Sequence, residues 1–309
     1  SYNYAGHNGG VMTGAPNPGL SWETTYMTNV GIRTEIFGRF DLEIEGYHNK
    51  TVNLLSNLDV SRTTGDTRAY RNVGTILNKG WEVTFTSKNI IPASRGGFKW
   101  DTDLNISHNA NKLIKLYNGI QKNVGNMMWA EGYDTQTYYL VRWAGVDPSD
   151  GAPLWLDKDG NVTRTYSTAN RVPYKSANPK ITGGVTNTFS YKNMRLSILM
   201  SYVIGGYLFS SFSRNSISDG LYIMQENQSL DQLDRWQKPG DIAANPKPIW
   251  GVSTSSVMNS TRYLYHRTSL SVQNVSFSYD LPKRYADFLG LNSLQFQVIG
   301  DNLYFYSPY

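Results

Sequence analysis

The feature that most restricts the fold is a two-residue alternation through residues 178–206, NPKITGGVTNTFSYKNMRLSILMSYVIGG. Its second half places apolar side chains at every second position, namely Met194, Leu196, Ile198, Met200 and Tyr202, with Arg195, Ser197 and Ser201 between them. Side chains of a strand point alternately to its two faces, so this pattern predicts a hairpin around Lys192 and Asn193 with one apolar face. A hydroxyl-rich opposite face is typical of a membrane β-barrel, although an amphipathic hairpin of a soluble all-β protein fits this stretch equally well.

Composition narrows the class of protein. The chain has 309 residues, of which 13% are aromatic and only 17% charged, and it contains no cysteine, so disulfides and thiolate metal sites are excluded. No run of 18 apolar residues is present, which excludes a transmembrane helix and leaves a barrel open. The net charge of +5 is scattered along the chain, so nucleic-acid binding has little support.

Eight strands are expected along the chain. Their predicted ranges are about 22–36, from 40 onward, 74–88, 98–108, two in 178–206, 263–280 and 294–305. Leu270 and Val272 have the opposite parity to Val275 and Phe277, which predicts a β-bulge in the seventh strand. The connector after it, 281–291, has room for one helical turn through Arg284 to Phe288.

The connections alternate between short and long. Residues 56–71 are polar and turn-rich, whereas about 110–176 and 211–260 are long excursions with many aromatic residues, and the remaining turns are short. A structureless connection of this length is rare, so both excursions are expected to be structured. Outer-membrane barrels have short periplasmic turns and long extracellular loops, and the alternation therefore favours an antiparallel transmembrane β-barrel.

Several motifs, in order, resemble the SusC/RagA family of TonB-dependent outer-membrane transporters. The stretches that carry the resemblance are Asn17–Leu55, Asn72–Phe85 (NVGTILNKGWEVTF), Glu131–Thr163, Asn178–Gly206, DRWQKPGDIAANPKP, RTSLSVQNVSFSYDLPK and the final GDNLYFYSPY. They cover nearly the whole chain. The resemblance implies that residues 1–309 are the C-terminal portion of a roughly 22-stranded barrel, without its plug domain and its final strand.

The resemblance also implies a function. Members of this family import glycan or peptide fragments across the outer membrane of Gram-negative bacteria, with a SusD-like surface lipoprotein as lid and the TonB complex as energy source, commonly as a dimer of such pairs. The chain is therefore expected to be a transporter rather than an enzyme, in contact with outer-membrane lipid. The alternative is a soluble all-β carbohydrate-binding or adhesion module, whose apolar strand faces would be covered by a second sheet.

Aromatic residues of the excursions are the candidates for contacts with substrate or lid. They are Trp129, Tyr133, Tyr139, Trp143, Trp155, Trp236 and Trp250. Each could equally pack the loops together, since Trp and Tyr serve as interior anchors as well as binding hot spots. Strand aromatics have another expected place, the membrane–water interface: Trp81, Trp100, Tyr191 and Tyr202.

No catalytic or cofactor motif is present. The four histidines are far apart in the sequence and have no ligand spacing, and the carboxylates Asp41, Glu43 and Glu45 form a same-face row of one strand. The segment with Asp157, Asp159 and Asn161 resembles a calcium-binding loop. Its glycine, however, is at the wrong position for the EF-hand pattern, and the glutamate that closes that pattern is absent. A hairpin turn is the expected role of this segment, and calcium is the minority alternative.

Overall fold

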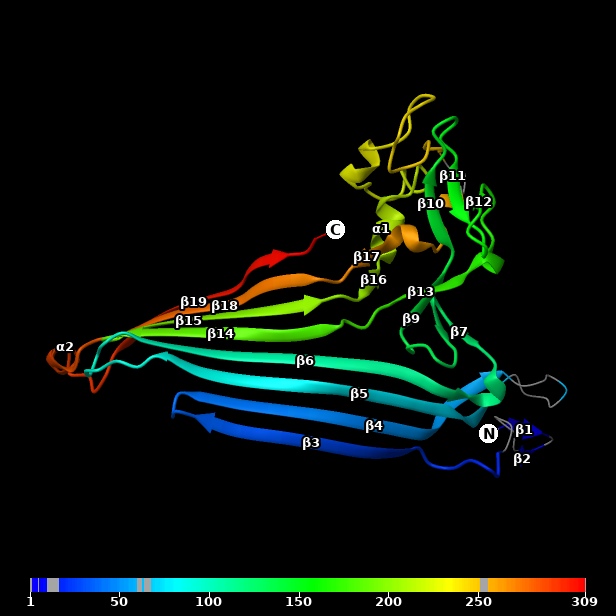
Figure 1. The fold of residues 1–309 in the computed structure, drawn as a ribbon. Coiled ribbons are helices and arrows are strands. Elements are labelled where there is room, and N and C mark those ends of the chain that lie inside the picture. The colour runs from blue at the N-terminus through cyan, green and yellow to red at the C-terminus, as the bar shows by residue number, and fades with distance from the viewer. Residues whose placement is uncertain are drawn as a thin grey trace.

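The computed structural model describes residues 2–4, 6–9, 17–59, 63, 68–250 and 255–308. An eight-stranded sheet dominates it (Figure 1), in the order β19-β18-β15-β14-β6-β5-β4-β3 with every neighbouring pair antiparallel. Its strands are β3 (Thr24–Ile36), β4 (Phe40–Asp59), β5 (Arg68–Ile90), β6 (Lys99–Leu116), β14 (Ile181–Tyr191), β15 (Met194–Ile204), β18 (Ser269–Asp280) and β19 (Gln295–Tyr306).

The eight predicted strands and their antiparallel arrangement are confirmed, with three differences in extent. β4 runs on to Asp59 and β5 already begins at Arg68, so residues 56–71 are mostly strand where a polar connection was expected. β6 likewise continues to Leu116, beyond the expected start of the first excursion. The seventh predicted strand is divided, because Leu264–His266 (β17) pairs with Tyr207–Phe209 (β16) in a separate ribbon before β18 begins.

The two faces of the sheet differ sharply in chemistry. Register pairs Ile44 with Val83, Val83 with Ile106 and Leu104 with Val185, so apolar side chains form rows across the strands on one face, called here the apolar face. The opposite, polar face carries carboxylates, amides and hydroxyls, among them Glu45 opposite Glu82. Many side chains of the apolar face are exposed, and within the described residues no second sheet covers them. Such a face suits lipid contact.

A β-bulge keeps the apolar rows continuous across β18. The register of β15 against β18 shifts between Leu199 and Met200, so that Gln273 is the additional residue between Val272 and Asn274. Leu270 and Val272 therefore stay on the apolar face although their parity is reversed. The predicted bulge is confirmed, and the observed register shows its effect, which is to keep Leu270 and Val272 on the apolar face.

Short turns gather at one end of the sheet and the excursions at the other (Figure 1). The turn end includes the connector with α2 (Lys283–Phe288), which confirms the predicted helical turn. The excursion end carries small sheets and single helical turns: β7 (Lys122–Val124), β8 (Met127–Trp129), β9 (Thr137–Leu140), β10 (Arg142–Val146), β11 (Pro153–Leu156), β12 (Val162–Thr163), β13 (Val172–Ser176), α1 (Ser211–Ser216), η2 (Tyr117–Gly119), η3 (Thr168–Asn170), η4 (Leu230–Leu233), η5 (Ser255–Val257) and η6 (Thr261–Tyr263). Near the N-terminus, β1 (Tyr2–Tyr4) pairs with β2 (His7–Gly9).

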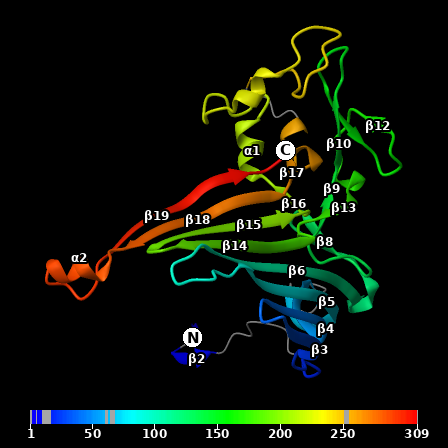
Figure 2. The ribbon, with the colours of Figure 1, turned by 60° about the vertical axis from the view of Figure 1, so that its left-hand side comes forward.

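The sheet is a curved wall that does not close on itself (Figure 2). Its two outermost strands, β3 and β19, each pair on one side only within the described residues. None of the described helices has the length and hydropathy to cross a membrane.

The hydrophobic core lies mainly in the excursions rather than in the wall. The largest completely buried side chains there include Trp155, Tyr263, Leu140 and Val141. Each structured excursion therefore has the packed interior that its length required.

Candidate functional site

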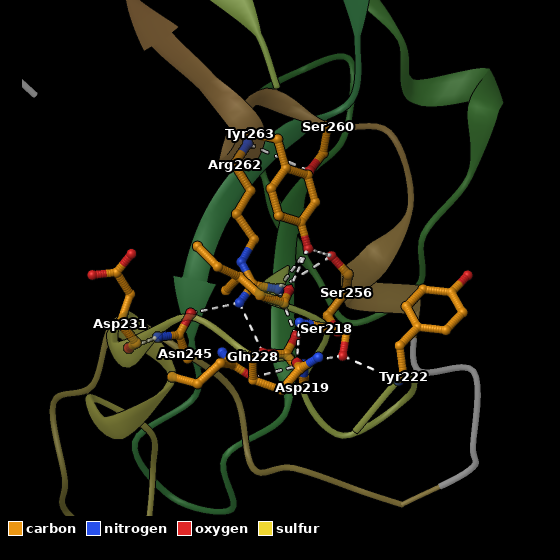
Figure 3. A network of polar contacts seen from close by, with 12 residues as sticks. Ser218, Asp219, Tyr222, Gln228, Asp231, Asn245, Ser256, Ser260, Arg262 and Tyr263 are labelled. Atoms are coloured by element: carbon orange, nitrogen blue, oxygen red, sulfur yellow. Dashed lines mark hydrogen bonds and ion pairs between the residues drawn. The ribbon is translucent and has the colours of Figure 1, made fainter. Parts of the chain in front are cut away.

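A buried polar network holds the second excursion together and reaches the first excursion through Arg262. Arg262, on η6, donates to Asp219 through both terminal nitrogens, with Nη2 2.8 Å from Oδ1, and donates to Asn245 Oδ1 at 2.7 Å (Figure 3). Its side chain is only 6% exposed and that of Asp219 is not exposed at all. Because an unpaired buried charge is expensive, this bidentate pair fixes the loop that carries Asp219 against η6.

Hydrogen bonds from neighbours complete the shell around this pair. Gln232 donates from Nε2 to Asp219 Oδ1 and accepts from the backbone N–H of Asp219. The Tyr263 hydroxyl shares its one proton between the carbonyls of Ile217 and Ser256, at 3.1 and 3.2 Å, and its burial raises the pKa of the phenol. Burial lowers the pKa of Arg262, but its bonds to Asp219 outweigh this, so that the pKa is raised and the guanidinium stays charged.

Aromatic rings extend the network into the first excursion. The guanidinium of Arg262 lies 4.9 Å from the ring centre of Trp143, which meets Trp155 edge to face at 5.7 Å. Trp155 in turn meets Tyr166 at 5.8 Å. The cation thus binds polar groups of the second excursion and an aromatic stack of the first.

Trp236 makes a second joint between the excursions. Its indole N–H donates to the carbonyl of Pro148 at 3.0 Å, and its ring lies on Gly151, which has φ +76°. A Cβ at Gly151 would stand 2.6 Å from that ring, so only glycine fits this turn. The hairpin at 147–152 is therefore shaped to receive Trp236.

A cavity of about 1000 Å³ lies between the excursions and the polar face of the sheet. Ser269 and Phe305 belong to the polar face of β18 and β19 and form part of its wall. The rest comes from the excursions, including Trp143, Phe212, Asp231, Asp234, Arg262, Tyr265, His266 and Arg267. Aromatic rings beside charged groups of both signs suit a polar ligand that also has apolar surface.

The predicted loop aromatics occupy different environments. Trp143 lines the cavity, whereas Trp155 is completely buried and Trp236 is 7% exposed, which favours the packing interpretation for these two. The others lie outside the cavity: Trp129 is half-buried with Lys122 over its ring, Tyr139 is half-buried, and Tyr133 and Trp250 are exposed. Their contact with substrate or lid stays a prediction.

The predicted interface aromatics lie toward the two ends of the apolar face. Trp100 and Tyr191 are near the short turns, and Trp81 and Tyr202 are toward the excursions. Ten residues of β6 separate the Tyr191 level from the Trp81 level, which at ~3.4 Å per residue and a tilt of ~40° is a height of about 25 Å. That height is close to the apolar band of outer-membrane barrels, but only six residues of β6 separate Trp100 from the Tyr202 level, so the assignment of all four residues to the two interfaces stays a prediction.

The Asp157–Asn161 segment is built as a turn. The Asp157 carboxylate accepts from the backbone N–H groups of Asp159 and Asn161 and from the Asn161 side chain. The bonds from Asn161 lead the causes that lower the pKa of Asp157. Gly160 has φ +93°, as the turn requires. Both carboxylate oxygens thus have internal donors, and no group of three metal-ligating side chains occurs among the described residues.

Sequence patterns gave no signal for Arg262, Asp219 and Asn245. Arg262 and Asp219 are 43 residues apart, within polar stretches that look like ordinary loop. Only the folding of the second excursion against η6 brings them together.

Comparisons with known proteins agree with this architecture. Residues 1–198 match the family model described as "TonB dependent receptor-like, beta-barrel". The chain belongs to this family. Its members are outer-membrane proteins of Gram-negative bacteria, and the relatives found are receptors and transporters, not enzymes.

Two relatives are TonB-dependent receptors P3 and P26 of Formosa agariphila, which are 27% and 25% identical over 98% and 97% of this chain. Among solved structures, the RagAB peptide importer in its closed-closed state superposes with a TM-score of 0.83, at 24% identity over 97% of this chain. The chain spans about a third of the length of these relatives, namely 31% and 32% of the two receptors and 33% of the importer chain. The resemblance to the SusC/RagA group and the barrel fold are confirmed.

Proposed function

We propose that this chain is part of a TonB-dependent importer that carries glycan or peptide fragments across the outer membrane. The observation that supports it best is the cavity of about 1000 Å³ between the polar face of the wall and the packed excursions. In a closed barrel the polar face lines the lumen, so a substrate in this cavity would lie at the entrance of the transport path. The volume is at the upper end for small-ligand sites, as expected for a fragment of several sugar or amino-acid units.

A SusD-like surface lipoprotein is the proposed partner above the excursions, and a dimer of transporter–lipoprotein pairs the proposed assembly. Apolar side chains on the second excursion are strongly exposed, including Ile242 at 96%, Leu230 at 81% and Met224 at 78%. A protein partner above the excursions would cover these apolar side chains, as protein contacts cover apolar surface. The TonB complex would act through the plug region of the whole protein.

The experiment uses the full-length transporter in its own host. Cells carrying it should take up labelled peptides or labelled oligosaccharides, and a protonophore should abolish uptake, because TonB draws on the proton gradient. A tagged transporter should also retain a surface lipoprotein during purification. Uptake that persists without the gradient would contradict the proposal, and the labelled class that enters decides between peptide and glycan.

A cavity variant refines this test. Phe212→Ala removes an exposed ring that lines the cavity, whereas Phe288→Ala removes an equally exposed ring from α2 at the opposite end of the sheet. Phe212→Ala should raise the substrate concentration needed for half-maximal uptake several-fold, and Phe288→Ala should leave it unchanged. Equal behaviour of the two variants would remove the cavity from the substrate path.

A further inference from the structure

A row of polar side chains interrupts the apolar face near the short turns. Ser87, Thr102 and Asn187 are register partners on β5, β6 and β14, and each shares its face with apolar neighbours along its own strand. Polar side chains on the lipid-facing side of a barrel are unfavourable unless they have hydrogen-bond partners. A contiguous row of them therefore calls for an explanation.

The row forms a chain of directed hydrogen bonds. The Ser87 hydroxyl donates to Asn89 Oδ1 at 2.8 Å, Asn89 Nδ2 donates to Thr102 Oγ1 at 2.7 Å, and the Thr102 hydroxyl donates to Asn187 Oδ1 at 2.8 Å. The Trp100 indole also donates to Asn187 Oδ1, at 2.9 Å.

An indole N–H can only donate, so it fixes the oxygen of Asn187 on this side of its amide. The amide nitrogen then points away from the chain of bonds. Its two N–H groups meet no acceptor in the part of the sequence that the structure describes. The row thus ends in a free donor beside the apolar surface.

Aromatic rings flank the row on both sides. Phe40 and Phe85 stack at 6.0 Å on one side, and Trp100 and Phe189 stack at 5.7 Å on the other. Of these rings, Trp100 is of the kind that gathers at the membrane–water interface, where polar lipid groups meet hydrocarbon.

A cation stands at the same edge. Arg39, in the turn between β3 and β4, donates from Nη2 to the backbone carbonyl of Asn89 at 3.1 Å. That bond holds the guanidinium beside the polar row. No carboxylate pairs with Arg39 among the described residues, so its remaining N–H donors are available for an anion.

We propose that this polar row is a binding site for one glycerophospholipid of the membrane leaflet at the short-turn end. The phosphate would lie on Arg39, an ester carbonyl would accept from the Asn187 amide, and the acyl chains would cover the apolar rows above. The charge of Arg39, the free amide donors and the continuity with the apolar face together match the headgroup, glycerol and tail of such a lipid. This inference rests on the proposed membrane placement of the wall.

The test counts lipid on the purified full-length protein by native mass spectrometry, with phosphatidylglycerol as the probe and sodium phosphate as a separate arm. The wild type should retain one phosphatidylglycerol that Asn187→Leu loses. Arg39→Gln should weaken its retention about tenfold or more, because it removes a charge-assisted hydrogen bond. Matched controls are Thr188→Leu, one residue along on the polar face, and Arg95→Gln in a neighbouring turn, and both should behave as wild type.

Three results would overturn the proposal. The first is equal lipid on the wild type and on Asn187→Leu. The second is binding of sodium phosphate that depends on Arg39 but not on Asn187, which would indicate an anion site. The third is loss of a dimer without loss of lipid, which would assign the row to contact between copies.

Variants are compared only if they keep the heat-modifiable gel migration of the folded barrel. If Asn187→Leu does not fold, Arg39→Gln, which lies in an exposed turn, is the variant that tests the proposal. Lipid retention is measured without transport, so failed uptake with retained lipid would contradict the import function and leave this site standing.

Discussion

At the scale of single residues, the decisive contact is the buried pair of Arg262 and Asp219. Removing one partner of such a pair leaves an uncompensated buried charge, which commonly costs about 3–5 kcal/mol. Asp219→Ala should therefore open the second excursion locally while the wall stays folded. Hydrogen exchange of residues 211–250 in the full-length protein should rise strongly. Asp287→Ala, whose partner Lys283 is exposed, is the control and should change nothing there.

Lysine cannot replace Arg262. An ammonium group lacks the planar fork that reaches Asp219 and Asn245 together, and it stacks less well on Trp143. We expect Arg262→Lys to recover only part of the protection lost in Arg262→Ala, again by hydrogen exchange. Full recovery would show that charge alone, without bidentate geometry, holds the second excursion against η6.

The lowered pKa of Asp157 makes the stability of the 157–161 turn depend on pH. Its folded pKa lies below the ordinary value, so it adds stability to the turn above the pKa of the unfolded chain, about 4, and this contribution disappears as pH falls through the folded pKa. After correction for the intrinsic exchange rate, which itself slows toward pH 3, the protection of the backbone amides at 158–161 should fall between pH 5 and pH 3 in the wild type and change much less in Asp157→Asn. A chelator should leave the turn unchanged at pH 7, and a chelator effect would revive the calcium alternative.

At the scale of elements, the bulge in β18 determines which side chains meet lipid. Deleting Gln273 would leave Leu270 and Val272 on the apolar face by simple alternation, whereas deleting Ser271 with the bulge in place would turn Leu270 to the polar face. The full-length Gln273 deletion should therefore keep heat-modifiable migration, which reports a folded barrel, and the Ser271 deletion should weaken it. Gln273→Ala keeps the residue count and should migrate as wild type.

The strands and the bulge are also the features that the sequence alone predicts. Alternation located all eight strands, and the parity break at Leu270 and Val272 located the bulge, because both follow from the period of two. The sequence did not predict that β4 extends to Asp59 and that β5 begins at Arg68. Strand residues beyond the apolar band are polar on both faces, so their sequence resembles that of a loop. The pairing of Arg262 with Asp219 was missed because it depends on how the second excursion folds back on η6, over 43 residues of sequence.

At the scale of the whole molecule, the topology predicts which end is outside the cell. The chain contains no cysteine, so Asp159→Cys and Arg95→Cys each add one thiol to it, between β11 and β12 at the excursion end and between β5 and β6 at the turn end, in a full-length background from which any other cysteine has been removed. In intact cells that express the full-length protein, a membrane-impermeant maleimide should label Asp159→Cys and spare Arg95→Cys. After lysis both should react, and the reverse pattern in intact cells would invert the proposed orientation.

The place of the core has a consequence for how this protein can change over generations. Fluid hydrocarbon fits any apolar shape, so most exchanges among Leu, Ile, Val and Met on the wall should be close to neutral. The excursions, by contrast, interlock Trp155, Tyr263 and Trp236 with a glycine that tolerates no Cβ. Loops usually diverge faster than the strands that carry them. Here we expect the interior of the excursions to diverge more slowly in sequence than the apolar face of the wall strands. Sequence differences among relatives should gather in the cavity lining and at the exposed loop tips.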